Sequence, residues 1–272
     1  MENFSAEHLL IVFALTTFAG LATGIGGAIG FFVRRTNTRL LTFFLGLSAG
    51  VMIFISFVEM FASAQRDLAE IFGHVRGGLF ALGAFFGGIG VAMLIDRLVP
   101  EESNPHETHG AEELDAPARV VPAGEMRRTG FLFMLAIGIH NFPEGMATFA
   151  AGLDGLTLGV PIAVAVALHN IPEGLAISVP VYSATGSRKK AFFYSFAAGL
   201  AEPVGALVGM LVLFPFLSPA LLAVLFAAVA GVMVFISFDE LLPMSERWGH
   251  HHVSVGGIVL GMLLMGCVLA VF

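Results

Sequence analysis

The chain has 272 residues, of which 57 % are hydrophobic and 12 % charged, and its formal net charge is −7. Soluble domains carry about a quarter charged residues, so this composition excludes an ordinary water-soluble protein and favours a membrane protein. Its 33 glycines fit that class, because small residues let membrane helices approach closely. The single cysteine, Cys267, excludes an intrachain disulfide.

Long apolar stretches predict the membrane spans, since a helix needs about 20 mostly apolar residues to cross a bilayer. Eight stretches meet that length: 8–33, 40–61, 77–98, 129–151, 158–182, 190–214, 219–242 and 253–272. The first follows MENFSAEHLL, which lacks the basic segment of a cleavable signal peptide, so we interpret it as a transmembrane helix. The segment 99–128 is rich in Glu, Pro and His and is interpreted as a flexible loop.

Positive residues orient these spans, because cytoplasmic loops carry an excess of Lys and Arg. Loops one, three, five and seven contain eleven of them: Arg34, Arg35, Arg39, Arg97, Arg119, Arg127, Arg128, Arg188, Lys189, Lys190 and Arg247. The opposite side has only Arg66 and Arg76. We therefore expect both termini to face the exterior or the periplasm.

Two stretches of the sequence recur. AGVMIFISFVE at 49–59 and AGVMVFISFDE at 230–240 share nine of eleven residues, and AGLAT at 19–23 resembles AGLAE at 198–202. Five expected crossings separate the copies, and an odd number reverses the chain direction, so the repeat is inverted. Inverted repeats are typical of transporters whose substrate site lies near the bilayer midplane.

The predicted fold is therefore an all-α polytopic membrane protein with eight transmembrane helices. Residues 1–98 contain helices one to three, and residues 183–272 contain helices six to eight as the inverted copy. Helices four and five occupy 129–182, after the loop at 99–128, which we place in the cytoplasm.

Helices four and five each carry one copy of the same motif, HNFPEG at 140–145 and HNIPEG at 169–174. In each copy His and Glu are four residues apart, as in His140 and Glu144 or His169 and Glu173, so they share one helix face. Imidazole and carboxylate groups are suitable ligands for zinc and neighbouring metals. The proline removes a backbone donor, which is tolerated at membrane depth mainly beside a cavity.

Three acids fall inside these spans: Glu144, Glu173 and, in AGLAEPVG on helix six, Glu202. Unpaired, they would together cost about 8–10 kcal/mol on the insertion scale. No Lys or Arg lies near the middle of these spans, so a divalent cation is the expected partner. Three carboxylates leave −1 with one such ion and +1 with two, so charge leaves both counts open.

In these motifs the chain resembles the ZIP family (Zrt/Irt-like zinc and iron transporters), and specifically its bacterial members. The resemblance covers nearly the whole chain, with HNFPEGMATF followed by ALHNIPEGLA. It implies a carrier for divalent metals, zinc first and also iron and manganese, that takes metal into the cytoplasm by alternating access, and it makes a homodimer plausible.

The resemblance also implies how the ligands divide between two metal sites. The first would contain His140, Glu144, His169 and Glu173. The second would contain Asn141, Asn170 and Glu202, and would share both motif glutamates with the first. Met52 occupies a position where some members of the family place a thioether beside the first site, although this match is weaker. The His–Asn pair of the second motif indicates selectivity broader than zinc alone.

Other acids and histidines lie toward the ends of the helices. Helix two would place Glu59 near the external mouth, and helix seven would place Asp239 and Glu240 near the cytoplasmic mouth, either to attract cations or as ordinary solvated acids. The loop histidines are read equally as metal receivers or surface residues: His106, His109, His250, His251 and His252.

The alternatives to a carrier are an intramembrane metalloenzyme and a passive cation channel. An intramembrane metalloenzyme would need a separate general base and typically an HExxH or repeated ExxH pattern, and the sequence contains neither. A passive cation channel binds ions weakly at several sites, whereas His and carboxylate ligands favour tighter binding. The predicted protein is therefore a carrier and not an enzyme.

Overall fold

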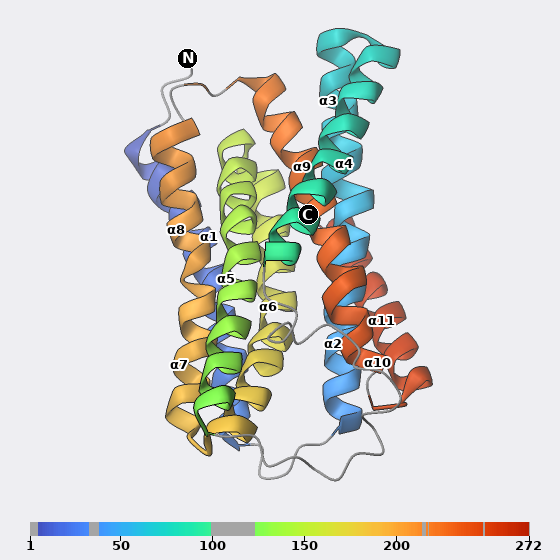
Figure 1. Ribbon diagram of the computed structural model, residues 1–272. Coiled ribbons are helices and arrows are strands. Elements are labelled where there is room, and N and C mark those ends of the chain that lie inside the picture. Colours follow the sequence, from blue (N-terminus) through green and yellow to red (C-terminus); the bar gives the residue numbers. More distant parts are fainter. Residues whose placement is uncertain are drawn as a thin grey trace.

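The computed structural model describes residues 5–32, 38–98, 123–213, 216, 218–246 and 248–271. Every regular element within these ranges is a helix and none is a strand, which confirms the all-α class. In chain order (Figure 1) they are α1 Ala6–Phe32, α2 Thr38–Ile55, η1 Ser56–Phe61, α3 Ala62–Phe72, α4 His74–Leu98, α5 Ala123–Asp154, α6 Leu156–Thr185, α7 Arg188–Gly199, α8 Ala201–Val208, η4 Gly209–Leu213, α9 Pro219–Ile236, η6 Ser237–Leu241, α10 Leu242–Glu246 and α11 His251–Val271.

Seven stretches of the described residues are long and apolar enough to cross a membrane: Ala6–Ile29, Thr38–Phe72, His74–Arg97, Leu156–Leu175, Arg188–Leu211, Pro219–Glu246 and His251–Val271. Each overlaps a span expected from the sequence. The expected span at 129–151 lies within α5, whose side chains are described mainly from Asn141 onward, and α5 is not among the seven. This pattern fits a polytopic membrane protein.

Helix α5 begins at Ala123, ahead of the expected start at 129, so the end of the 99–128 segment is helical. The added residues are Ala, Gly, Glu, Met, Arg and Arg, most of which favour helix formation. The remainder of that segment, with His106 and His109, lies outside the described residues.

The helices pack in two groups (Figure 1). In the first group, α1 packs against α6 and α7, and α5 packs against α6 and α8. In the second group, α2 packs against α11, and α4 packs against α3 and α9. Contacts of α2 with α6 and of α5 with α9 connect the groups. The two motif-bearing helices therefore lie side by side within the first group.

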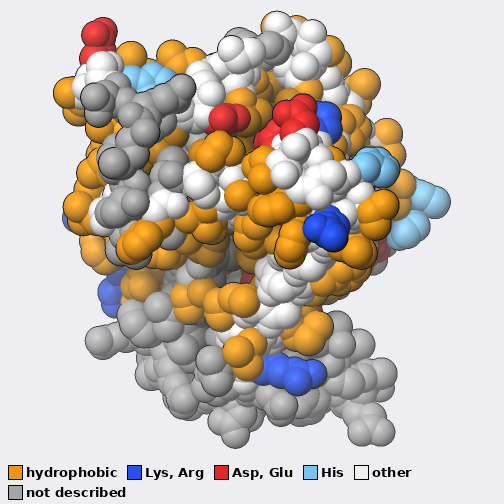
Figure 2. All heavy atoms as spheres, turned by 90° about the horizontal axis from the view of Figure 1, so that it is seen from above, with side chains coloured by type: hydrophobic (Ala, Val, Ile, Leu, Met, Phe, Trp, Pro, Cys, Tyr) orange, Lys and Arg blue, Asp and Glu red, His pale blue; other side chains and the backbone are white. Residues whose placement is uncertain are grey.

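Apolar side chains cover much of the outer surface. On α4, Leu79 is 64 % exposed and Phe86 59 %, and Leu263 on α11 is 61 % exposed. Figure 2 looks onto the end of the bundle that carries the N-terminus and shows hydrophobic side chains around much of the visible rim, with a few acidic groups among them. Large exposed apolar faces of this kind are compatible with a lipid environment rather than water.

Two long helices contain a π-helical turn at matching positions of the repeated sequence. The segments η1 and η6 each begin at the serine of the shared ISF triplet. Ser56 donates to Met52 O at 2.7 Å, and Ser237 donates to Met233 O at 2.8 Å. Because π-helical turns often occur at functional positions, both turns are candidates for such positions.

Candidate metal site

The two HNxPEG motifs lie in the interior of the first helix group. Both α5 and α6 continue as α-helices through the motif prolines. Asn141 and Asn170 are 0 % exposed, and Glu144 and Glu173 are 1 % exposed. Burying carboxylates this completely is costly unless a partner compensates the charge.

The last residue of each motif sets how closely the helices approach. A Cβ atom at Gly145 would lie 2.0 Å from Glu202 O on α8, and a Cβ atom at Gly174 would lie 2.0 Å from Thr23 O on α1. Only glycine allows these distances. The motif glycines thereby bring α5 against α8 and α6 against α1, so that Glu202 lies beside the motifs.

His169 presents one ring nitrogen to a motif glutamate. Its Nδ1 lies 3.2 Å from Ala165 O, and because a carbonyl can only accept, Nδ1 must be the donor. In the neutral ring Nε2 then carries a lone pair, and it lies 3.4 Å from Glu144 Oε2. A lone pair facing a carboxylate is favourable only with a proton or a cation between them. This nitrogen–oxygen pair has the donor types that zinc prefers.

Asn170 connects the motif to α1 and α8. Its Nδ2 donates to Ala19 O at 2.8 Å and also to Glu202 Oε1. On the other motif, Asn141 Nδ2 donates to Ala198 O at 3.3 Å. Both amide nitrogens are thus occupied by protein acceptors, and their carbonyl oxygens are left as the groups that could bind a cation.

Several buried oxygens in this region have no hydrogen-bond partner within the described part of the chain: Asn141 Oδ1, Glu144 Oε1, Asn170 Oδ1 and Glu202 Oε2. Leaving a buried acceptor unsatisfied costs about 1–3 kcal/mol, more for a charged group. Oxygen atoms of this kind, together with His169, are ligands that divalent transition metals accept. The donor set therefore fits a divalent cation.

The structure places the expected ligands as two pairs rather than as one complete cluster. The pairs are His169 with Glu144, and Asn170 with Glu202. Among the described residues no group of three or more His, Cys, Asp and Glu side chains is close enough to hold a metal ion. The side chain of His140 lies outside the described residues. Met52 is 0 % exposed on α2.

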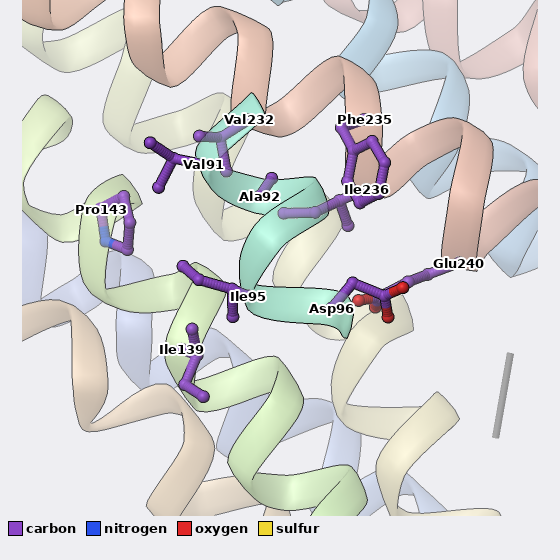
Figure 3. A pocket seen from close by; sticks show the side chains of 10 residues that line it. All are labelled: Val91, Ala92, Ile95, Asp96, Ile139, Pro143, Val232, Phe235, Ile236 and Glu240. Carbon is purple, nitrogen blue, oxygen red and sulfur yellow. The ribbon is translucent and has the colours of Figure 1, made fainter. Parts of the chain in front are cut away.

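A cavity of about 60 Å³ lies beside the motif on α5. Pro143, next to Glu144 in sequence, lines it, and at its far end Asp96 of α4 and Glu240 of η6 project into the same space (Figure 3). Glu240 was expected near one mouth of the path, whereas Asp96 was not expected from the sequence. The sequence feature that could have indicated Asp96 is its position as a single acid near the end of the apolar span at 77–98.

The peripheral groups have local contacts. Ser63 donates to Glu59 Oε1 at 3.3 Å. His250 Nε2 lies 3.1 Å from Thr38 Oγ1, and His251 Nδ1 lies 3.1 Å from Glu246 Oε1. These histidines therefore have partners at the surface.

Comparison with known proteins identifies the family of this chain. A family model described as ZIP Zinc transporter matches residues 96–269. A protein named Zinc transporter ZupT from Akkermansia muciniphila is 65 % identical, with 98 % of this chain and 99 % of the relative covered. Proteins of the same name from Nitratidesulfovibrio vulgaris (52 % identical; 97 % and 98 % covered) and Streptococcus mutans (49 %; 98 % and 99 %) are also similar. The expectation of a transporter rather than an enzyme is confirmed, and the chain belongs to the ZIP family of zinc transporters.

Proposed function

We propose that this chain carries zinc, and also iron and manganese, across the bacterial inner membrane into the cytoplasm. The observation that carries the proposal is the buried contact between His169 Nε2 and Glu144 Oε2, in which a nitrogen ligand of one motif lies 3.4 Å from an oxygen ligand of the other. The relatives named as zinc transporters support zinc as the first substrate. The nitrogen and oxygen ligands of the proposed site release metal more readily than thiolates would. This suits passage of the metal rather than its permanent capture.

The site holds two ions in this proposal. His140, Glu144, His169 and Glu173 bind the first. Asn141, Asn170 and Glu202 bind the second, and the two motif glutamates bridge both ions. The oxygens of Asn141, Asn170 and Glu202 without hydrogen-bond partners in the described chain support the second position. The two observed pairs would close around the ions when metal binds.

Helices one to three and six to eight form an inverted repeat around helices four and five. The matched glycine contacts of the two halves support this arrangement. A Cβ at Gly50 would lie 2.1 Å from Ile258 O on α11, and a Cβ at Gly231, its counterpart in the repeat, would lie 2.0 Å from Phe85 O on α4. The π-helical turns η1 and η6 occur in matching places as well.

The same correspondence relates the two motif helices. Asn141 Nδ2 donates to Ala198 O as Asn170 Nδ2 donates to Ala19 O, and Ala19 and Ala198 begin the repeated AGLA segments. An inverted repeat of this kind would let the molecule open alternately to the two sides around one fixed site. Alternating access is the transport cycle that we propose.

Acidic groups mark the two ends of the proposed path. In the expected orientation Glu59 would lie toward the outer side, and Asp96 and Glu240 would lie toward the cytoplasmic side. Both of the latter line the cavity that Pro143 also lines. Metal leaving the site would pass through this cavity. With α5 as the eighth crossing, both termini face outward and the Arg-rich loops face the cytoplasm. A homodimer stays a prediction.

Metal uptake into proteoliposomes tests the proposal. We expect saturable zinc uptake with counter-flow in the wild type, which separates a carrier from a channel. Glu144→Gln and Glu202→Gln keep the side-chain size but remove the charge, and each should reduce uptake of zinc, iron and manganese at least tenfold. Glu246→Gln is the matched control, because Glu246 is an exposed acid whose contact is with His251. Wild-type uptake by both buried variants would refute the proposal.

A further inference from the structure

Thr23 on α1 is 0 % exposed, yet its hydroxyl has no hydrogen-bond partner among the residues that the structure describes. A hydroxyl inside a helix can donate to the carbonyl four residues earlier. Thr16 on the same helix does so, with Val12 O at 3.1 Å. Thr23 therefore departs from the pattern of its own helix.

The site itself accounts for this difference. The carbonyl four residues before Thr23 is that of Ala19, and Asn170 Nδ2 donates to it at 2.8 Å. In an α-helix the N–H of Thr23 also donates to Ala19 O. A carbonyl oxygen has two lone pairs, so both are in use and the Thr23 hydroxyl has lost its local acceptor to a motif residue.

Thr23 also occupies on α1 the place that Glu202 occupies on α8. A Cβ at Gly199 would lie 2.9 Å from Thr23 Cβ and 3.1 Å from Thr23 Oγ1, and a Cβ at Gly20 would lie 3.1 Å from Glu202 Cβ. In the sequence the two residues end the repeated segments AGLAT and AGLAE. Thr23 of the first segment thus lies against Gly199 of the second, and Glu202 of the second lies against Gly20 of the first.

Asn141 contacts the residue next to the one that Thr23 contacts. The Thr23 side chain packs against Gly199, and Asn141 Nδ2 donates to the adjacent Ala198 O. Asn141 Oδ1 and Thr23 Oγ1 are both buried and both lack a hydrogen-bond partner within the described chain. The side chains of Asn141 and Thr23 thus contact the consecutive residues Ala198 and Gly199, and each has one oxygen for which a cation, or a water bound to it, would compensate the cost of burial.

We propose that Thr23 is a specificity-determining residue of the metal site, whose hydroxyl adds an oxygen donor beside Asn141, directly or through one bound water. This inference rests on the proposed metal transport. Oxygen ligands suit manganese, whereas imidazole suits zinc. The Thr23 hydroxyl therefore raises manganese transport relative to zinc transport, in the half of the site that lacks histidine.

The test is the ratio of kcat/KM for Mn²⁺ to kcat/KM for Zn²⁺, measured with the full chain in proteoliposomes. Thr23→Val keeps the shape of the side chain but removes its oxygen, and it should lower the ratio about tenfold. Thr23→Ser restores an oxygen and should retain the wild-type ratio. A purely structural loss would reduce both metals together and leave the ratio unchanged.

Thr42→Val is the matched control. Thr42 on α2 is 0 % exposed, and its hydroxyl also has no partner among the described residues. The residue of α2 that contacts a motif is Ser48, whose hydroxyl donates to His169 O. Thr42 lies six residues before Ser48, which is about 9 Å along the helix. Its ratio should equal that of the wild type. If Thr23→Val does not stay monodisperse, Thr23→Ala serves with the same criterion.

The outcomes separate this inference from the proposed function. An unchanged ratio in Thr23→Val, or an equal fall in Thr42→Val, overturns the role of Thr23 while leaving metal transport intact. Zinc uptake that survives in Glu144→Gln instead overturns the proposed function. A lowered ratio in Thr23→Val alone, with Glu144→Gln inactive, supports both.

Discussion

We expect Gly145→Ala to damage both the stability and the transport activity of the protein. The added Cβ would lie 2.0 Å from Glu202 O and 2.5 Å from Glu202 Cα, both backbone atoms that cannot turn aside. Because atoms in van der Waals contact lie at about 3.5 Å, α5 and α8 would have to separate by roughly 1 Å or more. Overpacking of this kind costs about 1–3 kcal/mol.

The same displacement acts on the site. Glu202 and Glu144 belong to the two helices that would separate, and metal–ligand distances tolerate only about 0.2 Å of change. We therefore expect zinc uptake to fall at least tenfold, because a misplacement near 1 Å can reduce activity by about 100-fold. Zinc uptake in proteoliposomes measures this loss, and the midpoint of thermal aggregation in detergent measures the loss of stability.

Gly87→Ala is the matched control for this substitution. It is also a glycine within a helix, on α4, but a Cβ there would meet nothing within 4 Å. It should leave uptake unchanged and preserve or slightly raise the thermal midpoint, because alanine favours the helix by about 0.5–1 kcal/mol. Wild-type uptake and thermal midpoint in Gly145→Ala would refute the packing argument, since α5 and α8 could then not be as close as the structure has them.

Two further predictions concern single side chains. Asn170→Ala removes the amide donor that Glu202 Oε1 and Ala19 O share. Zinc affinity, measured by calorimetric titration in detergent, should therefore fall about 10- to 100-fold, as expected for the loss of a hydrogen bond to a charged group. Unchanged affinity would show that this bond does not organise the site. Asp96→Asn should lower the kcat of zinc uptake several-fold with little change in KM, since Asp96 lies in the cavity beyond the site. The exposed acid Asp154 provides the control Asp154→Asn, and equal kcat values in the two variants would contradict a path through this cavity.

Local features of the sequence were sufficient for the fold class and for the candidate ligands. Runs of about 20 apolar residues have few stable alternatives to a membrane helix, because a bilayer requires every backbone group to be satisfied within the chain. Seven of the expected spans correspond to helices of that length and hydropathy. The acids within those spans could likewise be identified from sequence, since a charged residue at that depth is costly without a function.

The relation between residues on different helices depended on tertiary structure. Asp96 is one acid near a helix end in the sequence, and only the packing of α4 against α9 places it in a cavity with Glu240. Asn170 could be named as a ligand, but its bond to Ala19 O and its contact with Glu202 require three helices to meet.

Thr23 shows the limit of sequence most clearly. In the sequence it is a common helical residue, whose hydroxyl would be expected to bond within its own helix. Its acceptor is taken by a residue 147 positions later in the chain, Asn170, because Gly174 allows α6 to approach α1 within contact of Thr23 O. The sequence by itself determined which residues are candidates to bind a cation, since candidacy depends on the type of each side chain and its expected depth. Only the tertiary structure decided which of them meet, because side chains on separate helices are brought together by the close packing of glycine against backbone.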